Sequence, residues 1–398
     1  MIHNLSKYLF SLESKGIKLG LERTYDMLEA CGNPHESLTS IQILGTNGKG
    51  STASIIAQIL KKAGYKVGLY TSPHLNKLNE RVRINGKAIS DQDISNFIKT
   101  YKNKINNLSA SFFEVMTALA VWYFHKNKVD IAILETGLGG RLDSVSACKS
   151  ELLVFTSISL DHQHILGDTI EEIAKEKASV IQENSVCISC YQPESVANVL
   201  DKRAKSKNTK MQYVHQKKEN LIALNGKHQH INESLAIKAV ELLTQFNVSK
   251  DCISEGLLTV KWPARIQKIS NNPNIYFDVA HNIDSFISLC EFAQGLKINN
   301  SNILILALQN NKKIDQVISI IKKTFDQIIV TQTNQRNYLP TKDLKKLFND
   351  NNIIIFENPI KAFNYIKNIN KNTDIFIAGS HYLGPYVSNN YKISFDNI

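Results

Sequence analysis

The sequence lacks long hydrophobic runs and has few cysteines. No apolar stretch approaches the ~18 residues that a membrane helix needs, so we expect neither a membrane protein nor a membrane partner. The first seven residues lack the basic-then-apolar order of a signal peptide. Six cysteines, spread widely over 398 residues, are typical of a reducing compartment. We therefore expect a cytoplasmic protein.

A second C-x-x-C pair, which a zinc site needs, is also missing. The pair that is present, Cys187 and Cys190, lies in an alternating, strand-like run, whereas redox motifs of this kind open a helix. Structural cysteines are therefore the better interpretation.

Despite a net charge of +11, the sequence has no aromatic-interleaved basic patch of the kind that nucleic-acid-binding proteins carry. The basic residues are scattered, so we expect no nucleic-acid partner, while a polyanionic small molecule stays open. Internal repeats and low-complexity linkers are absent too. A chain of 398 residues is too long for one ordinary domain, and two domains are the natural expectation.

The sequence does contain a phosphate-binding pattern. The apolar run 41–44 is followed by Gly45, Thr46, Asn47, Gly48, Lys49, Gly50, Ser51 and Thr52, and then by a helical pattern that stops at Gly64. Glycines let backbone N–H groups converge on an anion, the helix N-terminus adds partial positive charge, and Lys49 adds a full charge. The hydroxyl of Ser51 or Thr52 can meet Mg²⁺. The stretch therefore predicts an ATP site.

This loop departs from the standard P-loop. The standard pattern has Gly where this chain has Ile43, and Ser or Thr directly after the lysine, where this chain has Gly50. A glycine-rich turn with an incidental lysine is the alternative. Because a clean strand precedes the loop and a clean helix follows it, we favour a variant P-loop.

Polar residues follow other predicted strands, and α/β proteins bind ligands at the carboxyl ends of their strands. Strand 66–70 leads to Ser72, strand 129–135 ends at Glu135, and strand 152–160 leads to His162. We expect Glu135 and His162 to lie side by side at the top of one parallel sheet and to hold Mg²⁺. On the helix expected over 170–180, spacing alone puts Lys177 on a solvated face.

Strands and helices alternate again after Trp262, with strands expected at 274–278, 302–307, 327–330 and 374–379. That order predicts a small doubly wound α/β domain. Its first strand ends at Asp278, and His281 follows. Since no second glycine-rich phosphate loop is present, we expect this domain to act as a lid over the nucleotide.

Together these segments resemble the Mur ligase superfamily and, within it, dihydrofolate synthase/folylpolyglutamate synthase. The matching motifs are Leu19-Gly-Leu-Glu-Arg23, Gly45 to Thr52, Thr71-Ser-Pro-His-Leu75, Asn79-Glu-Arg-Val-Arg83, Glu135 to Asp143, Asp161-His162 with Leu166-Gly167, Glu176-Lys177, Arg265 and Phe277 to Asn282. The resemblance implies a P-loop-containing parallel-sheet domain that binds ATP and folate over 1–268. A smaller Rossmann-like α/β domain, the glutamate ligase domain, is implied over 269–398.

The resemblance also implies roles for individual residues. The ATP-binding set is Gly45, Thr46, Asn47, Gly48, Lys49, Gly50, Ser51, Asn232, Arg265 and Asp278. The ligands of Mg²⁺, expected as two ions, are Ser72, Glu135 and His162. The substrate-binding set is Ile17, Lys18, Leu19, Phe112, Phe113, Glu114, Leu142, Asp143 and Ser144. Lys49, Lys177 and His281 are implied to be catalytic, with Lys177 carbamylated by CO₂ so that it helps to hold a metal.

The implied reaction is the ATP-dependent addition of L-glutamate to dihydropteroate and to tetrahydrofolate, a reduced folate, in folate biosynthesis. A carboxylate is a poor acyl donor, but phosphoryl transfer from ATP turns it into an acyl phosphate that an amine can attack. Lys49, the loop amides and Mg²⁺ would neutralise charge on the transferred phosphoryl group. A monomer is usual for the family.

Two stretches depart from the family pattern. Ser144-Val145-Ser146 replaces the usual Ala-Thr-Asn after Asp143, and Asn310-Asn311-Lys312-Lys313 replaces a stretch with Asp-Lys-Asp. The first changes hydrogen bonding near the pterin site, and the second removes two carboxylates. Neither touches the phosphate or metal residues.

Three alternative functions differ in what they require. A cell-wall Mur ligase needs a UDP-binding domain ahead of the P-loop, for which the residues before Gly45 leave no room. A P-loop regulatory ATPase does not explain Asp278 and His281 in a second domain. A folylpolyglutamate synthase that only extends tetrahydrofolate stays open, although 19–23 and 112–114 favour the bifunctional type.

Overall fold

The computed structural model describes residues 8–12, 20–216, 221–296, 301–335, 337–367, 369 and 372–398. These residues form two compact units. Unit 1 takes the described residues up to Ile222, then His230–Val260 and Asp396–Ile398. Unit 2 takes Ala223–Gln229 and Lys261–Phe395. We predicted a boundary after residue 268, and the division of the fold comes after Val260.

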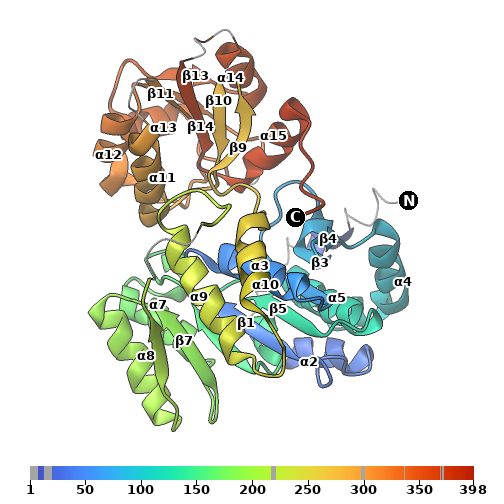
Figure 1. The fold of residues 1–398 in the computed structure, drawn as a ribbon. Coiled ribbons are helices and arrows are strands. Elements are labelled where there is room, and N and C mark those ends of the chain that lie inside the picture. Colours follow the sequence, from blue (N-terminus) through green and yellow to red (C-terminus); the bar gives the residue numbers. More distant parts are fainter. Residues whose placement is uncertain are drawn as a thin grey trace. The chain divides into compact units, whose positions relative to one another are not determined.

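Unit 1 is built on an eight-stranded sheet with the order β4-β3-β2-β5-β1-β6-β7-β8 (Figure 1). Its strands are β1 (Ser40–Leu44), β2 (Val67–Tyr70), β3 (Val82–Ile84), β4 (Lys87–Ala88), β5 (Ile131–Glu135), β6 (Leu152–Phe155), β7 (Val186–Cys190) and β8 (Met211–Val214). β3 pairs antiparallel with both β2 and β4, and all the other neighbouring strands pair parallel. β1 and β5 are buried along their whole length, as central strands covered on both faces should be.

Helices cover both faces of this sheet. They are α2 (Glu22–Ala30), α3 (Lys49–Lys62), α4 (Asp91–Asn107), α5 (Phe112–Lys126), α6 (Gln163–Leu166), α7 (Ile170–Ala178), α8 (Glu194–Ser206), α9 (Gln229–Leu242) and α10 (Lys250–Thr259), with short 3-10 turns at Leu78–Arg81 and Ser144–Ala147. α2, α4 and α5 share one apolar core with β2 and β5, and α7 and α8 share another with β6. α10 packs so closely on α3 that a Cβ on Gly256 would lie 2.8 Å from the Ile59 Cα.

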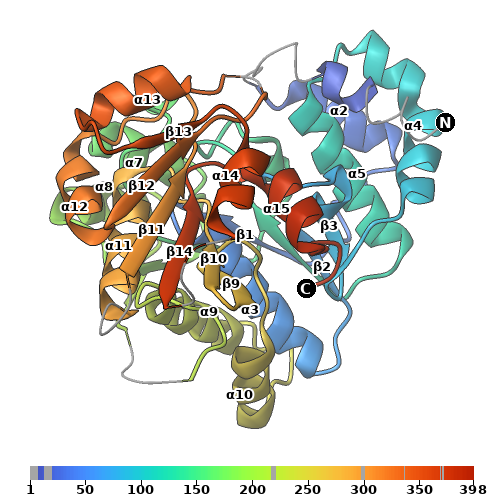
Figure 2. The same ribbon diagram turned by 90° about the horizontal axis from the view of Figure 1, so that it is seen from above.

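Unit 2 contains a six-stranded sheet with the order β13-β12-β11-β14-β10-β9. Its strands are β9 (Gln267–Asn271), β10 (Asn274–Phe277), β11 (Ser301–Leu306), β12 (Gln327–Thr331), β13 (Ile354–Phe356) and β14 (Thr373–Ala378). Its helices are α11 (Ile283–Leu296), α12 (Ile318–Thr324), α13 (Thr341–Phe348), α14 (Pro359–Ile366) and α15 (Gly384–Tyr391), with 3-10 turns at Asp315–Val317 and His381–Leu383. Figure 2 shows α11, α12 and α13 on one face of the sheet, and α14 and α15 on the other. The predicted doubly wound domain is confirmed, with β9 added antiparallel at one edge.

The structure places the Cys187 and Cys190 pair and also bears on the expected absence of a membrane helix. Cys187 and Cys190 lie on β7 as free thiols, and burial raises the pKa of each to about 12. The strand assignment of this pair is therefore confirmed. Within the described residues, no helix combines the length and the apolar character needed to cross a membrane.

Candidate active site

Four of the predicted ligand-binding residues of unit 1 lie at the carboxyl ends of four consecutive strands. In sheet order, Ser72 follows β2, Glu135 ends β5, Gly45 follows β1, and His162 follows β6. Glu135 and His162, which we expected side by side, follow strands that are not neighbours in the sheet. β1, the strand of the P-loop, lies between their two strands, and each step across a sheet spans about 4.8 Å. Glu135 and His162 thus flank the phosphate loop.

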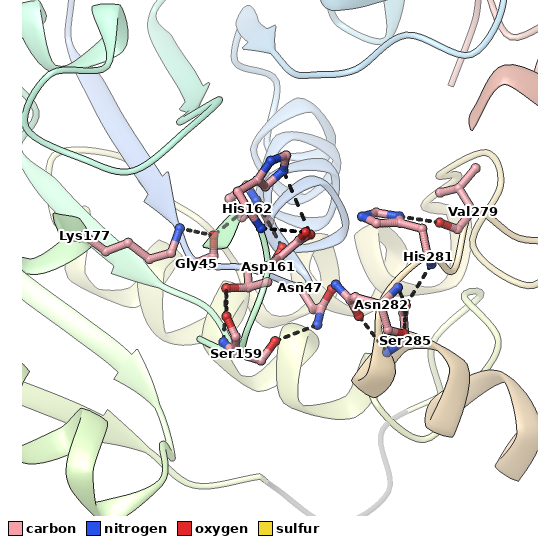
Figure 3. A network of polar contacts seen from close by, with 12 residues as sticks. Gly45, Asn47, Ser159, Asp161, His162, Lys177, Val279, His281, Asn282 and Ser285 are labelled. Carbon is pink, nitrogen blue, oxygen red and sulfur yellow. Dashed lines mark hydrogen bonds and ion pairs between the residues drawn. The ribbon is translucent and has the colours of Figure 1, made fainter. Parts of the chain in front are cut away.

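The variant P-loop is anchored to the segment after β6. The backbone N–H groups of Thr46 and Asn47 both donate to the Ser157 carbonyl, at 2.7 and 3.2 Å. The side chains of the same two residues bond to Ser159, at 3.0 and 3.1 Å (Figure 3). Their amides therefore hold the loop in shape. The N–H groups that face a phosphate are better sought in the first turn of α3, which has no intrahelical acceptors for them.

Glycine is required at two points of the loop. Gly45 has φ +140°, and a Cβ there would lie 1.9 Å from the Thr156 hydroxyl oxygen. Gly48 has φ +88°, and its Cβ would lie 2.3 Å from Oδ1 of Asn232, in the first turns of α9. The loop thus packs against Asn232, a residue predicted to bind ATP. Nearby, the buried hydroxyl of Thr52 has no hydrogen-bond partner among the described residues, which leaves a polar group for a ligand or water.

Two lysines converge on the carbonyl of Gly45. Lys49 donates to the carbonyls of Gly45 and Thr46, at 3.2 and 3.1 Å. Lys177, on α7, donates to the same Gly45 carbonyl at 2.8 Å (Figure 3). The loop therefore holds two lysine side chains together beside its phosphate-binding turn.

Lys177 is buried, with 5% of its surface exposed, whereas Lys175 on the same helix is exposed. Burial, followed by the nearby charge of Lys49, lowers the pKa of Lys177 to about 7. Our expectation from spacing, that Lys177 lies on a solvated face of its helix, is wrong. The signal was present, because Ile173, Ala174 and Ala178 form a buried stripe that passes through position 177.

The predicted magnesium ligands differ in their surroundings. Glu135 is buried, and its Oε2 accepts a hydrogen bond from the backbone N–H of Ser72 at 3.0 Å. His162 has a 40% exposed side chain, and its Nε2 lies 3.9 Å from Oδ2 of Asp161. Among the described residues, no cluster of three or more His, Cys, Asp or Glu side chains is arranged to hold a metal. One carboxylate beside a phosphate loop nevertheless fits Mg²⁺, which is usually bound by one or two carboxylates, water and substrate phosphates.

The predicted folate site includes the start of α5. Ser111 and Glu114 form a reciprocal capping box, so Glu114 has a structural role in starting the helix. The same buried carboxylate pairs with Arg23 at 3.0 Å. Arg23, which lies in a matching motif but was assigned no role, keeps a buried Nη2 without a hydrogen-bond partner among the described residues. Phe112 is buried and Phe113 half-buried. Ile17, Lys18 and Leu19, predicted for the same site, lie outside the described residues.

Asp143 organises the loop between β5 and the 3-10 turn 144–147. Its carboxylate oxygens accept the N–H groups of Leu138 and Val145, at 2.8 and 3.0 Å. Burial raises its pKa to about 6, although these hydrogen bonds oppose the shift. Leu142, next to it, is half-buried.

The departure at Ser144–Ser146 is accommodated by hydrogen bonds within unit 1. Ser144 Oγ lies 2.6 Å from Thr117 Oγ1 on α5. Ser146 donates to the Gly140 carbonyl and accepts from Gln42 on β1, each at 2.9 Å. Both serines therefore brace the Asp143 loop against its neighbours.

The predicted site residues of unit 2 lie in a turn and beside a helix cap. Asp278, buried after β10, accepts the N–H groups of Ile266 and Ala280 at 2.7 and 2.6 Å. His281 Nδ1 lies 2.7 Å from the Val279 carbonyl, which can only accept, so Nδ1 carries the proton (Figure 3). Asn282 Oδ1 accepts the Ser285 N–H at the start of α11. The helix cap is thus provided by Asn282.

Two protein-family models match this chain. Residues 43–250 match the Mur ligase middle domain, and residues 264–381 match the Mur ligase glutamate ligase domain. The two matches cover most of unit 1 and unit 2 respectively.

Individual relatives agree with these matches. Dihydrofolate synthase/folylpolyglutamate synthase of Bacillus subtilis is 31% identical over 402 residues, covering 92% of this chain and 94% of the relative. Escherichia coli FolC in complex with DHPP and ADP has TM-score 0.90 at 26% identity, covering 98% of this chain and 97% of its own. The folylpolyglutamate synthase of Thermotoga maritima has TM-score 0.84 at 30% identity, covering 98% and 96%. The chain therefore belongs to the Mur ligase family, in the dihydrofolate synthase/folylpolyglutamate synthase group of ATP-dependent ligases.

Proposed function

We propose that this ligase joins L-glutamate by an amide bond to dihydropteroate and to tetrahydrofolate, with ATP as the energy source. The observation that carries the proposal is the variant P-loop, in which Lys49 and Lys177 both bond to the Gly45 carbonyl, in a chain of this family. Cell-wall Mur ligases and regulatory ATPases also have a phosphate loop. The Bacillus subtilis relative that matches this chain over almost the whole length of both proteins, however, is named as a dihydrofolate synthase/folylpolyglutamate synthase.

The reaction consists of two displacements. In the first, a carboxylate oxygen of the folate attacks the γ-phosphorus of ATP, ADP leaves, and an acyl phosphate forms. In the second, the glutamate amine attacks the acyl carbon, and the tetrahedral intermediate collapses to amide and inorganic phosphate with loss of the amine proton. Lys49 and the first-turn amides of α3 stabilise negative charge on the transferred phosphoryl group.

Ser72, Glu135 and His162 are the residues that we propose to hold Mg²⁺. When bound, the ion would neutralise charge on the ATP phosphates. The hydrogen bond from the Ser72 amide fixes the Glu135 carboxylate in one orientation. The single buried carboxylate fits an ion that shares its coordination with water and phosphate oxygens.

Lys177 is the proposed site of carbamylation. Its neutral amine would attack the carbon of CO₂ and lose a proton, which gives an N-carboxylate with one negative charge. A pKa of about 7 leaves a large share of this amine neutral near pH 7. The product would replace a buried cation with an anion beside Gly45, and so supply a second carboxylate for metal binding.

The residues that we propose to surround the pterin are Phe112, Phe113, Glu114, Leu142, Asp143 and Ser144. The residues of unit 2 that we propose to act on the nucleotide and glutamate are Arg265, Asp278 and His281. His281 Nδ1 is held by the Val279 carbonyl, which fixes the orientation of the imidazole ring. We also propose a cytoplasmic monomer. The lid role of unit 2 stays a prediction.

Product analysis tests the assignment. Purified protein is incubated with ATP, Mg²⁺ and glutamate, with dihydropteroate in one reaction and tetrahydrofolate in another, and the products are identified by mass spectrometry. Glutamate addition to both substrates supports the bifunctional enzyme. Addition to tetrahydrofolate alone identifies a chain extender, and products from neither substrate contradict the proposal.

A further inference from the structure

Arg265 is the central residue of a strained turn in unit 2. The residues on either side, Ala264 and Ile266, have φ angles of +56° and +46°, in the left-handed region. This region is unfavourable for residues other than glycine and is a marked outlier for a β-branched residue such as isoleucine. Both side chains are almost completely buried. The surrounding structure must therefore hold the turn in this conformation.

Asp278 is one of the groups that hold it. Its Oδ2 accepts the Ile266 N–H at 2.7 Å, and its Oδ1 accepts the Ala280 N–H at 2.6 Å. The Val279 N–H donates to the Ala264 carbonyl at 3.2 Å. The carboxylate is 8% exposed, and burial raises its pKa. A buried carboxylate with each oxygen bonded to a backbone amide is well suited to fixing a loop.

Gln267 holds the same turn from its other side. Its Oε1 accepts the Ala264 N–H at 3.0 Å. Arg265 itself uses Nη1 to donate to the Ala264 carbonyl at 3.0 Å. A guanidinium has five N–H donors, so further donors remain for an anionic ligand.

We propose that Asp278 is a positioning residue, which keeps the Ala264–Ile266 turn in its left-handed conformation so that the Arg265 guanidinium is fixed for a phosphate oxygen of ATP. The proposal rests on the proposed function. It differs from the role that the resemblance implies for Asp278, which is direct contact with the nucleotide.

The test separates positioning from contact by making the strained conformation easier to adopt. Asp278→Asn turns one acceptor into a donor that faces a backbone N–H, so it should loosen the turn and raise KM for ATP about tenfold. Ala264→Gly lets residue 264 adopt a positive φ without a steric cost. In the double variant, Ala264→Gly should recover a large part of the lost affinity. If Asp278 contacts ATP directly, the glycine recovers nothing, and the proposal fails.

Gln267→Ala is the second variant and covers the case in which Asp278→Asn does not fold. It weakens the turn without altering Asp278, and it should also raise KM for ATP, with partial recovery by Ala264→Gly. An unchanged KM in Gln267→Ala would overturn the proposal. Arg265→Gln is the matched control: it should raise KM in a way that Ala264→Gly cannot restore.

A fluorescence readout distinguishes failure of this proposal from failure of the proposed function. Trp122→Phe leaves Trp262, three residues before Arg265, as the single tryptophan. Asp278→Asn should increase quenching of Trp262 by acrylamide, and Ala264→Gly should reverse the increase, whether or not the protein makes amides. Unchanged quenching in Asp278→Asn would show that the carboxylate does not hold the turn.

Discussion

A buried lysine and a half-buried lysine donate to one backbone carbonyl in unit 1, that of Gly45. Burial, and after it the nearby charge of Lys49, lowers the pKa of Lys177. Bringing two positive charges together costs free energy. A bound phosphate, or a carbamate at Lys177, would offset that cost. The arrangement is therefore suited to an anionic substrate.

Lys49→Ala should abolish turnover, with a loss of about 10³-fold or more in kcat, because charge on the transferred phosphoryl group then lacks its cation. The measurement is ATP-dependent phosphate release. Lys62→Ala is the control, since Lys62 lies on the same helix and makes an exposed ion pair with Glu255. Turnover within a few fold of the wild-type enzyme in Lys49→Ala would contradict the phosphoryl-transfer role.

Lys177→Ala should lose most activity, and added acetate or formate should restore part of it by taking the place of the carbamate carboxylate. Phosphate release with and without the added acid is the measurement. Lys175→Ala, an exposed lysine of the same helix, should behave like the wild-type enzyme. A fully active Lys177→Ala enzyme would remove the basis for the carbamate.

The carbamate should form more readily as pH rises. The amine reacts only when neutral, and for a pKa of about 7 the neutral fraction rises about tenfold from about pH 6 to pH 8. Carbamylation also releases a proton, so higher pH favours the product. At fixed dissolved CO₂, activation of CO₂-depleted enzyme should therefore be greater at the higher pH. Activation that does not change with pH would contradict the assigned amine.

At the scale of elements, strand order is what the sequence could not supply. The apolar runs of β1, β5 and β6 were predicted, and so was their polar carboxyl edge. That β1 lies between β5 and β6 depends on pairing across 92 residues of chain (Ser40 with Ala132) and 111 residues (Ile41 with Leu152), which local patterns do not encode. β9 was missed because its alternation, Gln267 to Asn271, is polar and half-exposed.

Gly48→Ala tests the fit between the phosphate loop and α9. Alanine there would strain a left-handed φ of +88° and would push against Asn232, so it should lower stability and weaken ATP binding. Gly64→Ala is a matched control, because Gly64 has φ +91° with nothing within 4 Å of its Cβ. The control should cost about 1 kcal/mol and leave ATP binding unchanged. Thermal unfolding and ATP titration of both variants provide the comparison, and equal ATP affinity would contradict the account.

For the whole molecule, the motifs predicted more than composition did. The two α/β units and the ligase family could be predicted from the motifs at the strand ends, taken in their order along the chain. Three features did not follow from these motifs: the burial of Lys177, the turn around Arg265 and the return of the chain end to unit 1. In that last feature the Ala88 N–H donates to the Asp396 carbonyl, and Lys77 pairs with the Asp396 carboxylate at 2.8 Å. The contacts of Asp396 join residues far apart in the chain and have no local signature, whereas the burial of Lys177 had one in the apolar stripe of its helix.

Phosphate release from ATP tests the central claim most directly. The purified protein is assayed with ATP, Mg²⁺ and glutamate, adding dihydropteroate in one reaction, tetrahydrofolate in a second and neither in a third. We predict release in the first two reactions, none in the third, and loss of release when EDTA removes the magnesium. Phosphate release that is the same in all three reactions, or absent from all of them, would contradict the assignment as a folate–glutamate ligase.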